Sequence, residues 1–261
     1  MNPKDTLHLL TKNTVLYERF SSLTFWQKFK VAWEIFHLQA QIIFSKKFIW
    51  YLAGILIYFV VVYIINYRQS MIDRMTQEDI LPWLLQFPLS ILAVYLNMQL
   101  IAGEKENRTL EVMFTTAGSR YKVWLLRVTT LNLLLLLIAF GLSGVAFFTI
   151  ADIAVIGTAL HGFIPTFFVG SMTLYFSVRF RSGFAAGMIS AGLLILILMF
   201  SEAFNETRYF LYFNPYDVPR RLDPETWRLW MWQNRIALIF LGIFLHFFAL
   251  RGLEAREDLL R

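Results

Sequence analysis

Few residues in this chain could do acid–base chemistry inside an apolar segment. His161 and His246 fall within long apolar runs, and Asp152 lies near the end of one such run. Ionisable residues in membrane segments are functional candidates by default. However, no pair of histidines with a carboxylate is spaced to bind a metal, and no Ser or Thr has a nearby base. A histidine near the end of a span is more often a hydrogen-bonded structural residue.

Nucleotide and thiol chemistry also lack the residues they need. The chain contains no cysteine, which removes disulfides, thiolate metal sites and a cysteine nucleophile. It has no GxxxxGK[ST] loop to cradle phosphates. The Leu142-Ser143-Gly144 triplet lies within an apolar run and cannot serve as an ATPase signature. We therefore expect no enzyme activity, no metal and no cofactor in this chain itself.

The composition indicates a membrane protein. Of the 261 residues, 57% are hydrophobic and 16% are charged, and the mean hydropathy is +0.55. A soluble domain carries about 25% charged residues, and a disordered chain is far less apolar. The 26 Phe, 11 Tyr and 8 Trp residues suit aromatic belts at the two membrane interfaces.

Six apolar runs approach the ~20 residues that a helix needs to cross a ~30 Å hydrocarbon layer. We predict an all-α, polytopic membrane protein with six transmembrane helices. The fourth run is the weakest, because His161, Gly162 and Pro165 interrupt it. The predicted spans cover residues of about 48–65, 80–102, 128–150, 153–178, 183–200 and 236–250.

The charges outside these runs predict the orientation. Seventeen of the 24 Lys and Arg residues lie on the side that holds both chain ends, and seven lie on the other side. The acidic residues divide evenly, so the net charge is +8 on the first side and −2 on the second. The positive-inside rule then places both termini in the cytoplasm. The basic balance reports orientation, and no nucleic-acid-binding element is present.

The predicted organisation has three parts: a cytoplasmic N-terminal segment (1–47), a transmembrane domain (48–250) and a cytoplasmic tail (251–261). From about Thr24 to Phe44, Trp and Phe recur at helical spacing beside lysines. This pattern favours an amphipathic helix in the headgroup region over a cytosolic helix packed on the protein. The outer connection, about 201–234, is broken by prolines and rich in tryptophan, and it reads equally well as a structural cap or an outer gate.

Two smaller sets of residues have open interpretations. Gly183, Gly187 and Ser190 are small residues at close helical spacing. They allow close helix packing, either within one chain or between two copies of it. The polar residues Tyr58, Asn97 and Gln99 could line a transport path or form hydrogen bonds between helices. All three belong to predicted spans.

The most informative connection, about 103–127, joins the second and third spans. From Ile101 to Val128 the sequence reads IAGEKENRTLEVMFTTAGSRYKVWLLRV. Apolar residues at Leu110, Met113 and Phe114 are spaced like one face of a short helix. A charged helix of this kind is a poor membrane element and a good docking element for a soluble partner. The alternative is a helix that lies on the bilayer surface.

This connection resembles the cytoplasmic loop of ABC-2 type transporter permeases. This sequence departs from the family pattern at three places: Arg108 stands where the family has Gly, Ala117 where it has Pro, and Leu126-Arg127 where it has Gly-Lys. The plan of six spans, an N-terminal amphipathic helix and a long loop before the last span is similar too. The matching residues are Glu104-Lys105, Thr109-Leu110-Glu111, Ser119-Arg120 and Leu125-Leu126-Arg127, with Asn214-Pro215 in the outer loop.

The resemblance implies the transmembrane subunit of an ATP-driven exporter in the inner membrane of a prokaryote. A separate ABC ATPase in two copies would dock on the loop and carry ATP and Mg²⁺. A second permease copy would complete a homodimer, and the apolar, aromatic spans favour a lipid-like or amphipathic substrate. The implied docking and coupling residues are Glu104, Glu106, Arg108, Thr109, Leu110, Glu111, Met113, Phe114, Ser119 and Arg120.

Other readings stay open. The chain could transmit force to an extracytoplasmic partner protein instead of moving a solute, with the tryptophan-rich outer loop as the docking surface. An intramembrane enzyme or a secondary transporter is less favoured, because the predicted spans nearly lack ionisable residues.

Overall fold

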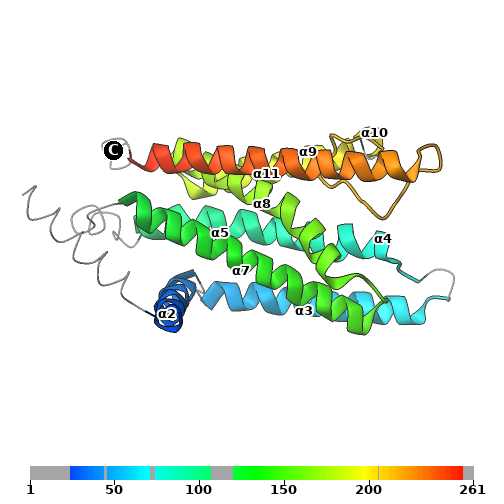
Figure 1. Cartoon of the computed structure of the whole chain (residues 1–261), viewed down its shortest axis with the longest axis horizontal. Coiled ribbons are helices and arrows are strands. Elements are labelled where there is room, and N and C mark those ends of the chain that lie inside the picture. The colour runs from blue at the N-terminus through cyan, green and yellow to red at the C-terminus, as the bar shows by residue number, and fades with distance from the viewer. Residues whose placement is uncertain (1–23, 44–45, 71–73, 107–119, 205, 255–261) are drawn as a thin grey trace, which may run out of the picture. The chain divides into compact units, whose positions relative to one another are not determined.

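The computed structural model describes residues 24–43, 46–70, 74–106, 120–204 and 206–254. These residues form helices and turns with no β-strand among them, which confirms the predicted all-α class. The chain divides into two units, residues 1–42 and 43–261, and each is described by itself. The helices, labelled in Figure 1, are α2 (Phe25–Ile43), α3 (Lys46–Arg68), α4 (Gln77–Ile80), η1 (Leu81–Gln86), α5 (Phe87–Glu106), α7 (Arg120–Thr149), α8 (Val155–Phe180), α9 (Gly183–Met199), α10 (Ser201–Phe204) and α11 (Pro224–Glu254).

The first unit contributes helix α2, which occupies the range where the sequence predicts a helix. It begins after Thr24, whose N–H donates to Oε1 of Gln27 at 2.9 Å. Such a bond satisfies an otherwise free donor at a helix start. The side chains of Phe25, Trp26 and Trp33 are all more than half exposed. The position of this helix at a membrane surface stays a prediction.

Five described helices in the second unit are long and apolar enough to cross a membrane, over residues 49–68, 77–100, 123–149, 155–180 and 224–253. Helix α9 is apolar as well but shorter, with 17 residues. Large apolar side chains cover the outer faces of these helices, and Phe240 of α11, for example, is 70% exposed. These features suggest a multi-pass membrane protein whose outer helix faces contact lipid.

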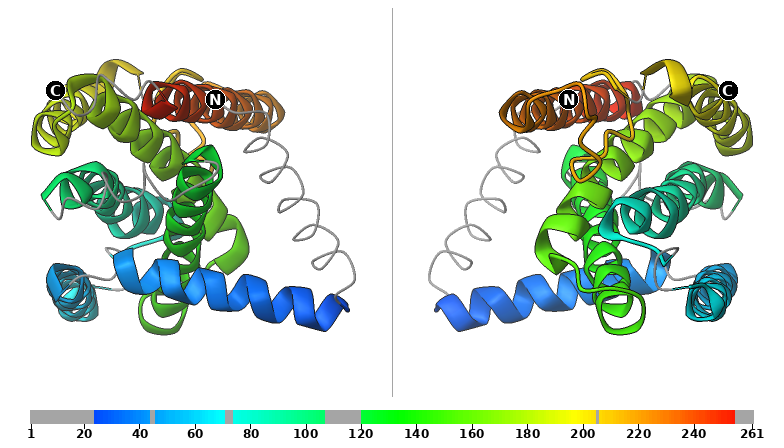
Figure 2. Two further views of the ribbon diagram at one scale, coloured as in Figure 1. Left: turned by 90° about the vertical axis from the view of Figure 1, so that its left-hand side faces the viewer. Right: turned by 90° about the vertical axis from the view of Figure 1, so that its right-hand side faces the viewer.

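Helix α8 lies at the centre of the second unit and packs against α5, α7, α9 and α11. Figure 2 shows several of these helices nearly end-on. The expectation that His161, Gly162 and Pro165 weaken this span is wrong, because α8 runs unbroken for 26 residues. Gly162 and Pro165 are buried. A Cβ on Gly162 would lie only 3.1 Å from Cβ of Leu85, so the glycine allows close approach of η1.

The second span contains a π-helical turn, η1, between α4 and α5. The N–H of Phe87 donates to the carbonyl five residues before it. In this register the next donor would be the nitrogen of Pro88, which carries no hydrogen. The carbonyl of Trp83 is therefore left without a main-chain partner, and the hydroxyl of Tyr58 in α3 donates to it at 3.2 Å. A side chain of α3 thus supplies the hydrogen bond that Pro88 cannot donate to the carbonyl of Trp83.

A tight turn joins α8 to α9 where the sequence predicts the fifth apolar run to begin. Arg181 has a left-handed backbone, with φ of 56°, a conformation that commonly ends a helix. The next helix starts at once, because Oγ of Ser182 accepts the N–H of Ala185 at 3.3 Å.

The last helix, α11, begins at Pro224, twelve residues before the predicted span, and so includes the final part of the predicted outer connection. Oδ2 of Asp223 accepts the N–H groups of Glu225 (3.1 Å) and Thr226 (3.3 Å). Pro224 occupies the first helical position, where its missing N–H costs nothing. At the predicted connection of about 103–127, α5 reaches Glu106 and α7 begins at Arg120, so both helices extend into this range.

Substituting Gly242→Ala should loosen the packing of α11 on α8. The added Cβ would lie 2.5 Å from Cε1 of Phe167, and this ring is stacked on His246 with centroids 5.1 Å apart. We expect a loss of about 1–3 kcal/mol of stability, measured as a lower thermal unfolding midpoint in detergent.

The matched control is Gly192→Ala in α9, where an added Cβ meets nothing within 4 Å. This variant should unfold at the same or a higher temperature, because alanine favours a helix over glycine. Equal midpoints for the two variants would contradict the close approach of α8 and α11.

Candidate functional site at the cap end of the bundle

Residues 206–223, which we call the cap segment, connect α10 to α11 and are held by hydrogen bonds from α11. Nδ2 of Asn234 donates to the carbonyls of Arg208 (3.0 Å) and Phe210 (2.9 Å). Nη2 of Arg235 donates to the carbonyl of Phe213 at 2.7 Å. Two neighbouring side chains of one helix thus fix the main chain of the segment at three points.

The guanidinium of Arg235 is the most buried charged group described in the protein, at 1% exposure. Besides the bond to Phe213, Nη1 donates to Oδ1 of Asn234 (3.1 Å) and Nε to Nδ1 of His161 (3.4 Å). These three partners are neutral acceptors. A buried charge is costly unless its donors are satisfied, and here the bonds come from α8, α11 and the cap segment together.

His161 accepts two hydrogen bonds, one at its ring and one at its main-chain carbonyl. Pro165 lies four residues later in α8 and has no N–H, so the carbonyl of His161 lacks its helical donor. Nε2 of Gln86 fills that position at 3.4 Å. The ring nitrogen Nδ1 accepts from Arg235, so both the ring and the carbonyl of His161 act as acceptors here.

The cap segment is also tied to the start of the second span. Nδ2 of Asn214 donates to the carbonyl of Glu78 at 2.8 Å. The hydroxyl of Tyr216 lies 3.2 Å from Oγ1 of Thr158 in α8, which also accepts from Nε2 of Gln77 at 3.0 Å. The segment is therefore bonded to α4, α8 and α11.

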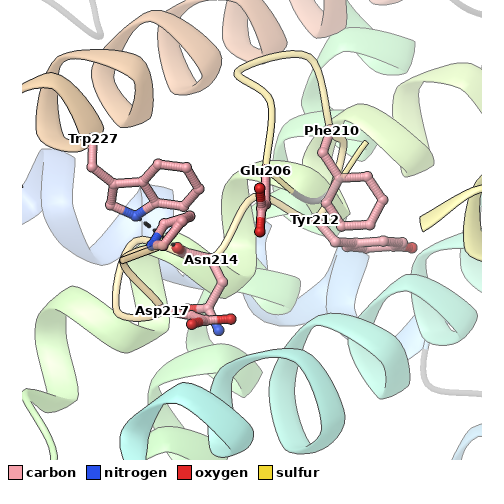
Figure 3. A pocket seen from close by; sticks show the side chains of 7 residues that line it. Glu206, Phe210, Tyr212, Asn214, Asp217 and Trp227 are labelled. Carbon is pink, nitrogen blue, oxygen red and sulfur yellow. Dashed lines mark hydrogen bonds between the residues drawn. The ribbon is translucent and has the colours of Figure 1, made fainter. Parts of the chain in front are cut away.

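A small pocket of about 100 Å³ opens between the cap segment and the start of α11. Figure 3 shows its side chains; in this view Glu206 lies between Trp227 and the Phe210–Tyr212 pair. The lining residues are Glu206, Phe210, Tyr212, Asn214, Asp217, Pro219 and Trp227.

The wall of the pocket formed by Trp227 is rigid. Its ring is 2% exposed and stacks on Phe213 with centroids 4.2 Å apart. Its Nε1 donates to the carbonyl of Asn214 at 3.2 Å. On the other side, burial raises the pKa of Tyr212 to about 12, so this phenol stays neutral at physiological pH.

The charged groups of the pocket are two exposed carboxylates, those of Glu206 and Asp217. Within the described part of the chain, no ion pair or hydrogen bond joins either carboxylate to another residue. Nearby Arg208 does not neutralise them: Nη1 donates to Gln233 (3.2 Å) and Nη2 to the hydroxyl of Tyr209 (2.7 Å). The pocket therefore combines negative charge with aromatic walls.

A second buried polar group lies along α11. Nδ1 of His246 is 3.0 Å from the carbonyl of Gly242, and Nε2 is 3.3 Å from Nδ2 of Asn132 in α7. The carbonyl can only accept, so Nδ1 carries the hydrogen and Nε2 accepts from the amide. The ring is also stacked on Phe167. His246 therefore has the contacts of a structural residue.

Among the described residues, no group of three His, Cys, Asp or Glu side chains could hold a metal ion.

Most of the predicted docking residues lie outside the described residues: Arg108, Thr109, Leu110, Glu111, Met113, Phe114 and Ser119. Of the others, Glu104 and Glu106 belong to the last turn of α5, and Arg120 is the first residue of α7. The two helices thus present these three positions at the two ends of the connection.

The small residues Gly183, Gly187 and Ser190 are buried on one face of α9. A Cβ on Gly187 would lie 2.5 Å from Sδ of Met98 in α5, so at this position the face packs within the same chain. Packing between two chains through these residues stays a prediction.

The three polar residues predicted to line a path or bond between helices have different surroundings. Tyr58 bonds to η1, as described above. Asn97 is 1% exposed, and Nδ2 donates to the carbonyl of Ala93 at 2.9 Å. Gln99 is half-buried in the following turn of α5.

Sequence reasoning missed Asn234 and Arg235, which hold the cap end, and placed Trp227 only among the tryptophans of the outer connection. Counting Arg235 among the charges of the outer loop concealed its place inside a helix. The signal that could have found it is Asp223-Pro224, a cap followed by a proline at the first helical position, which starts the helix before Trp227.

Comparisons with known proteins identify no relative. No family model, curated protein or solved structure matches this chain.

Removing the guanidinium in Arg235→Ala should detach the cap segment from α11. The carbonyl of Phe213 and Nδ1 of His161 would lose their donor inside the bundle, at a cost of about 2 kcal/mol. We expect a lower thermal unfolding midpoint in detergent and faster proteolysis within residues 206–223.

The matched control is Arg228→Ala, an exposed arginine two turns earlier on α11. Its effect on stability should stay within ~0.5 kcal/mol. If Arg235→Ala were as stable and protease-resistant as this control, the anchoring role of Arg235 would be wrong.

Proposed function

We propose that this chain is the transmembrane subunit of an ATP-driven exporter of the ABC-2 type. The observation that carries the proposal is the mixed charged and apolar pattern of residues 103–127. The helices that bound this connection, α5 and α7, both pack on α8. A partner that moved the connection would therefore move two helices against the central one.

In this proposal a separate ABC ATPase binds the connection. Leu110, Met113 and Phe114 would fill a cleft of the ATPase, and the surrounding charges would fix its orientation. The ATPase would supply ATP and Mg²⁺, because the sequence has no phosphate-binding loop. Two ATPase copies and two copies of this chain would form the working unit.

The proposed topology has six spans with both termini in the cytoplasm of a prokaryotic cell. The short helix α9 is ~25 Å long at ~1.5 Å per residue, slightly less than the ~30 Å hydrocarbon layer. Phe200 and α10 continue the path toward the cap segment. Helix α2 would lie in the cytoplasmic headgroup region, where Trp and Phe side chains enter the bilayer.

The packing of α8 supports a path that is shared between two chains. A Cβ on Gly170 would lie 2.7 Å from Nδ2 of Asn97 in α5. One on Gly252 of α11 would lie 2.9 Å from Cγ1 of Val178. Because helices in such close contact leave no room for cargo, we place the route for a lipid-like or amphipathic substrate between two copies of the chain.

A mechanical role is the second candidate, and the bonded cap segment favours it. A segment tied to α4, α8 and α11 could pass helix movement to an external protein. Liposomes containing the chain and its ATPase separate the two functions: export requires a lipid or amphiphile to stimulate ATP hydrolysis. Stimulation by an external protein alone would favour the mechanical role.

Single-cysteine labelling tests the proposed topology, because the chain has no native cysteine. Arg179→Cys and Glu202→Cys, both at exposed positions, flank α9 on opposite sides. A membrane-impermeant maleimide should label Glu202→Cys in intact cells, and Arg179→Cys only after permeabilisation. Labelling of both variants from outside would mean that α9 does not cross the membrane.

Charge reversal tests the docking of the ATPase. Glu111→Lys should weaken the ATPase complex about tenfold, equivalent to ~1.4 kcal/mol, and uncouple ATP hydrolysis from transport without unfolding the spans. Native mass spectrometry of the co-purified complex and a liposome transport assay would measure the two effects. The control is Glu202→Lys, an equal charge change at the cap end. Normal coupled transport by Glu111→Lys would remove the docking assignment.

A further inference from the structure

We propose that the pocket between the cap segment and α11 binds the ammonium group of an organic cation, either as a free amine or as a lipid headgroup. The inference goes beyond the exporter assignment and does not depend on it, because binding at this pocket requires no ATPase. It rests on the charge, the walls and the size of the pocket.

The charge of the pocket calls for a positive ligand. Glu206 and Asp217 both line it, and in the described part of the chain neither has an ion-pair or hydrogen-bond partner. Both side chains are exposed, so each can turn toward a ligand in the pocket. Their negative charges would attract a cation there and repel an anion.

The walls of the pocket favour an organic cation. Trp227, Phe210 and Tyr212 line the pocket, and in Figure 3 they flank Glu206. Trp227 and Tyr212 are 2% and 7% exposed and form an apolar wall, whereas Phe210 is partly exposed. An aromatic face such as that of Phe210 attracts cations through the ring quadrupole.

A bare divalent metal fits the pocket less well. Calcium takes six to eight oxygen ligands, but the pocket offers two carboxylates and the amide of Asn214. That amide is already engaged: Oδ1 accepts the N–H of Tyr216 at 3.2 Å, and Nδ2 donates to Glu78. These groups supply fewer oxygen ligands than calcium takes.

The size of the pocket limits the ligand to a small group. Its volume of about 100 Å³ is well below the ~300–1,000 Å³ of pockets for drug-sized molecules. A headgroup-sized cation fits such a space, while the remainder of an amphiphile would stay outside it.

The pocket is also preorganised, which lowers the entropic cost of binding. Asn234 and Arg235 hold the carbonyls of Arg208, Phe210 and Phe213 from the α11 side. These bonds fix the stretch of main chain that carries Phe210 and Tyr212. A ligand would therefore meet a wall that is already formed.

Choline binding to the purified, full-length chain tests the proposal. The chain is placed in phosphatidylglycerol nanodiscs, choline chloride is titrated by calorimetry, and the signal of empty nanodiscs is subtracted. We expect saturable binding that weakens at least tenfold in the Glu206→Gln/Asp217→Asn variant. The control, Glu202→Gln, removes an exposed carboxylate that does not line the pocket and should bind choline like the wild-type chain.

Two further arms sharpen the result. The neutral choline analogue 3,3-dimethylbutanol has the same shape without the charge, and it should not compete. Repeating the titration in phosphatidylcholine nanodiscs distinguishes the source of the ammonium group: a lipid headgroup that occupies the pocket would weaken choline binding, and a free amine site would bind equally in both lipids.

The proposal is overturned if choline does not bind, if the double variant binds it as well as the control does, or if dimethylbutanol competes equally. Calcium binding that depends on the two carboxylates, without choline binding, would also overturn it. Because both substitutions keep the side-chain shape and the carboxylates are exposed, the variants should fold, and equal thermal midpoints check this. Loss of ATPase co-purification would contradict the proposed function and leave this result unaffected.

Discussion

The satisfaction of main-chain carbonyls inside an apolar bundle is the constraint on which this structure depends. Water is absent from the hydrocarbon core, so each freed carbonyl needs a donor from the protein. Two prolines create such carbonyls, at Trp83 in η1 and at His161 in α8, and Tyr58 and Gln86 supply the donors. Each of these two hydrogen bonds joins one helix to another. The sites where a proline interrupts the main-chain bonding therefore become connections between helices.

The same constraint explains why a charged residue can lie at the cap end of the bundle. The cap segment has no regular secondary structure over most of its length, so its carbonyls need side-chain donors. Asn234 and Arg235 provide them from α11. An arginine has five N–H donors in a fixed planar array, and it can therefore bridge Phe213, Asn234 and His161 at once. The cost of burying its charge is offset by connecting three separate parts of the fold.

The sequence predicted the helical class and the positions of the apolar helices, because a run of ~20 apolar residues has few other stable structures. It misjudged α8, since Gly162 and Pro165 weaken an isolated helix. In the bundle Gly162 allows close packing, and the His161 carbonyl that Pro165 leaves without a helical donor accepts from Gln86. It missed Arg235 for a related reason. A charge next to an apolar run marks the end of a span on average, and only the tertiary partners of this arginine show that it is inside.

The residues of the pocket were separated by up to 21 positions and had no pattern of their own in the sequence. Glu206 and Asp217 were counted as charges of the outer side, and Trp227 as an interfacial aromatic residue. They share a pocket because Asp223 starts α11 early and folds Trp227 back onto Phe213. The Asp223-Pro224 pair marks where the helix begins, but no local spacing rule pairs Trp227 with Phe213.

The hydrogen bonds of α8 are distributed unequally along its length, and this bears on how the bundle could move. Before Pro165, Thr158 and His161 bond to the cap segment, α4, η1 and α11. After Pro165, the side chains of Ser171 and Thr173 bond to carbonyls of α8 itself, and α8 contacts its neighbours there through apolar side chains such as Leu174 and Val178. Packing of that kind has no preferred bond direction, so a slight rotation between helices costs less than it does at the cap end. The helices α5 and α7 enter their connection on this second side of α8. A force applied at the connection would therefore act where the bundle yields most readily, while the cap segment and its pocket keep their bonds.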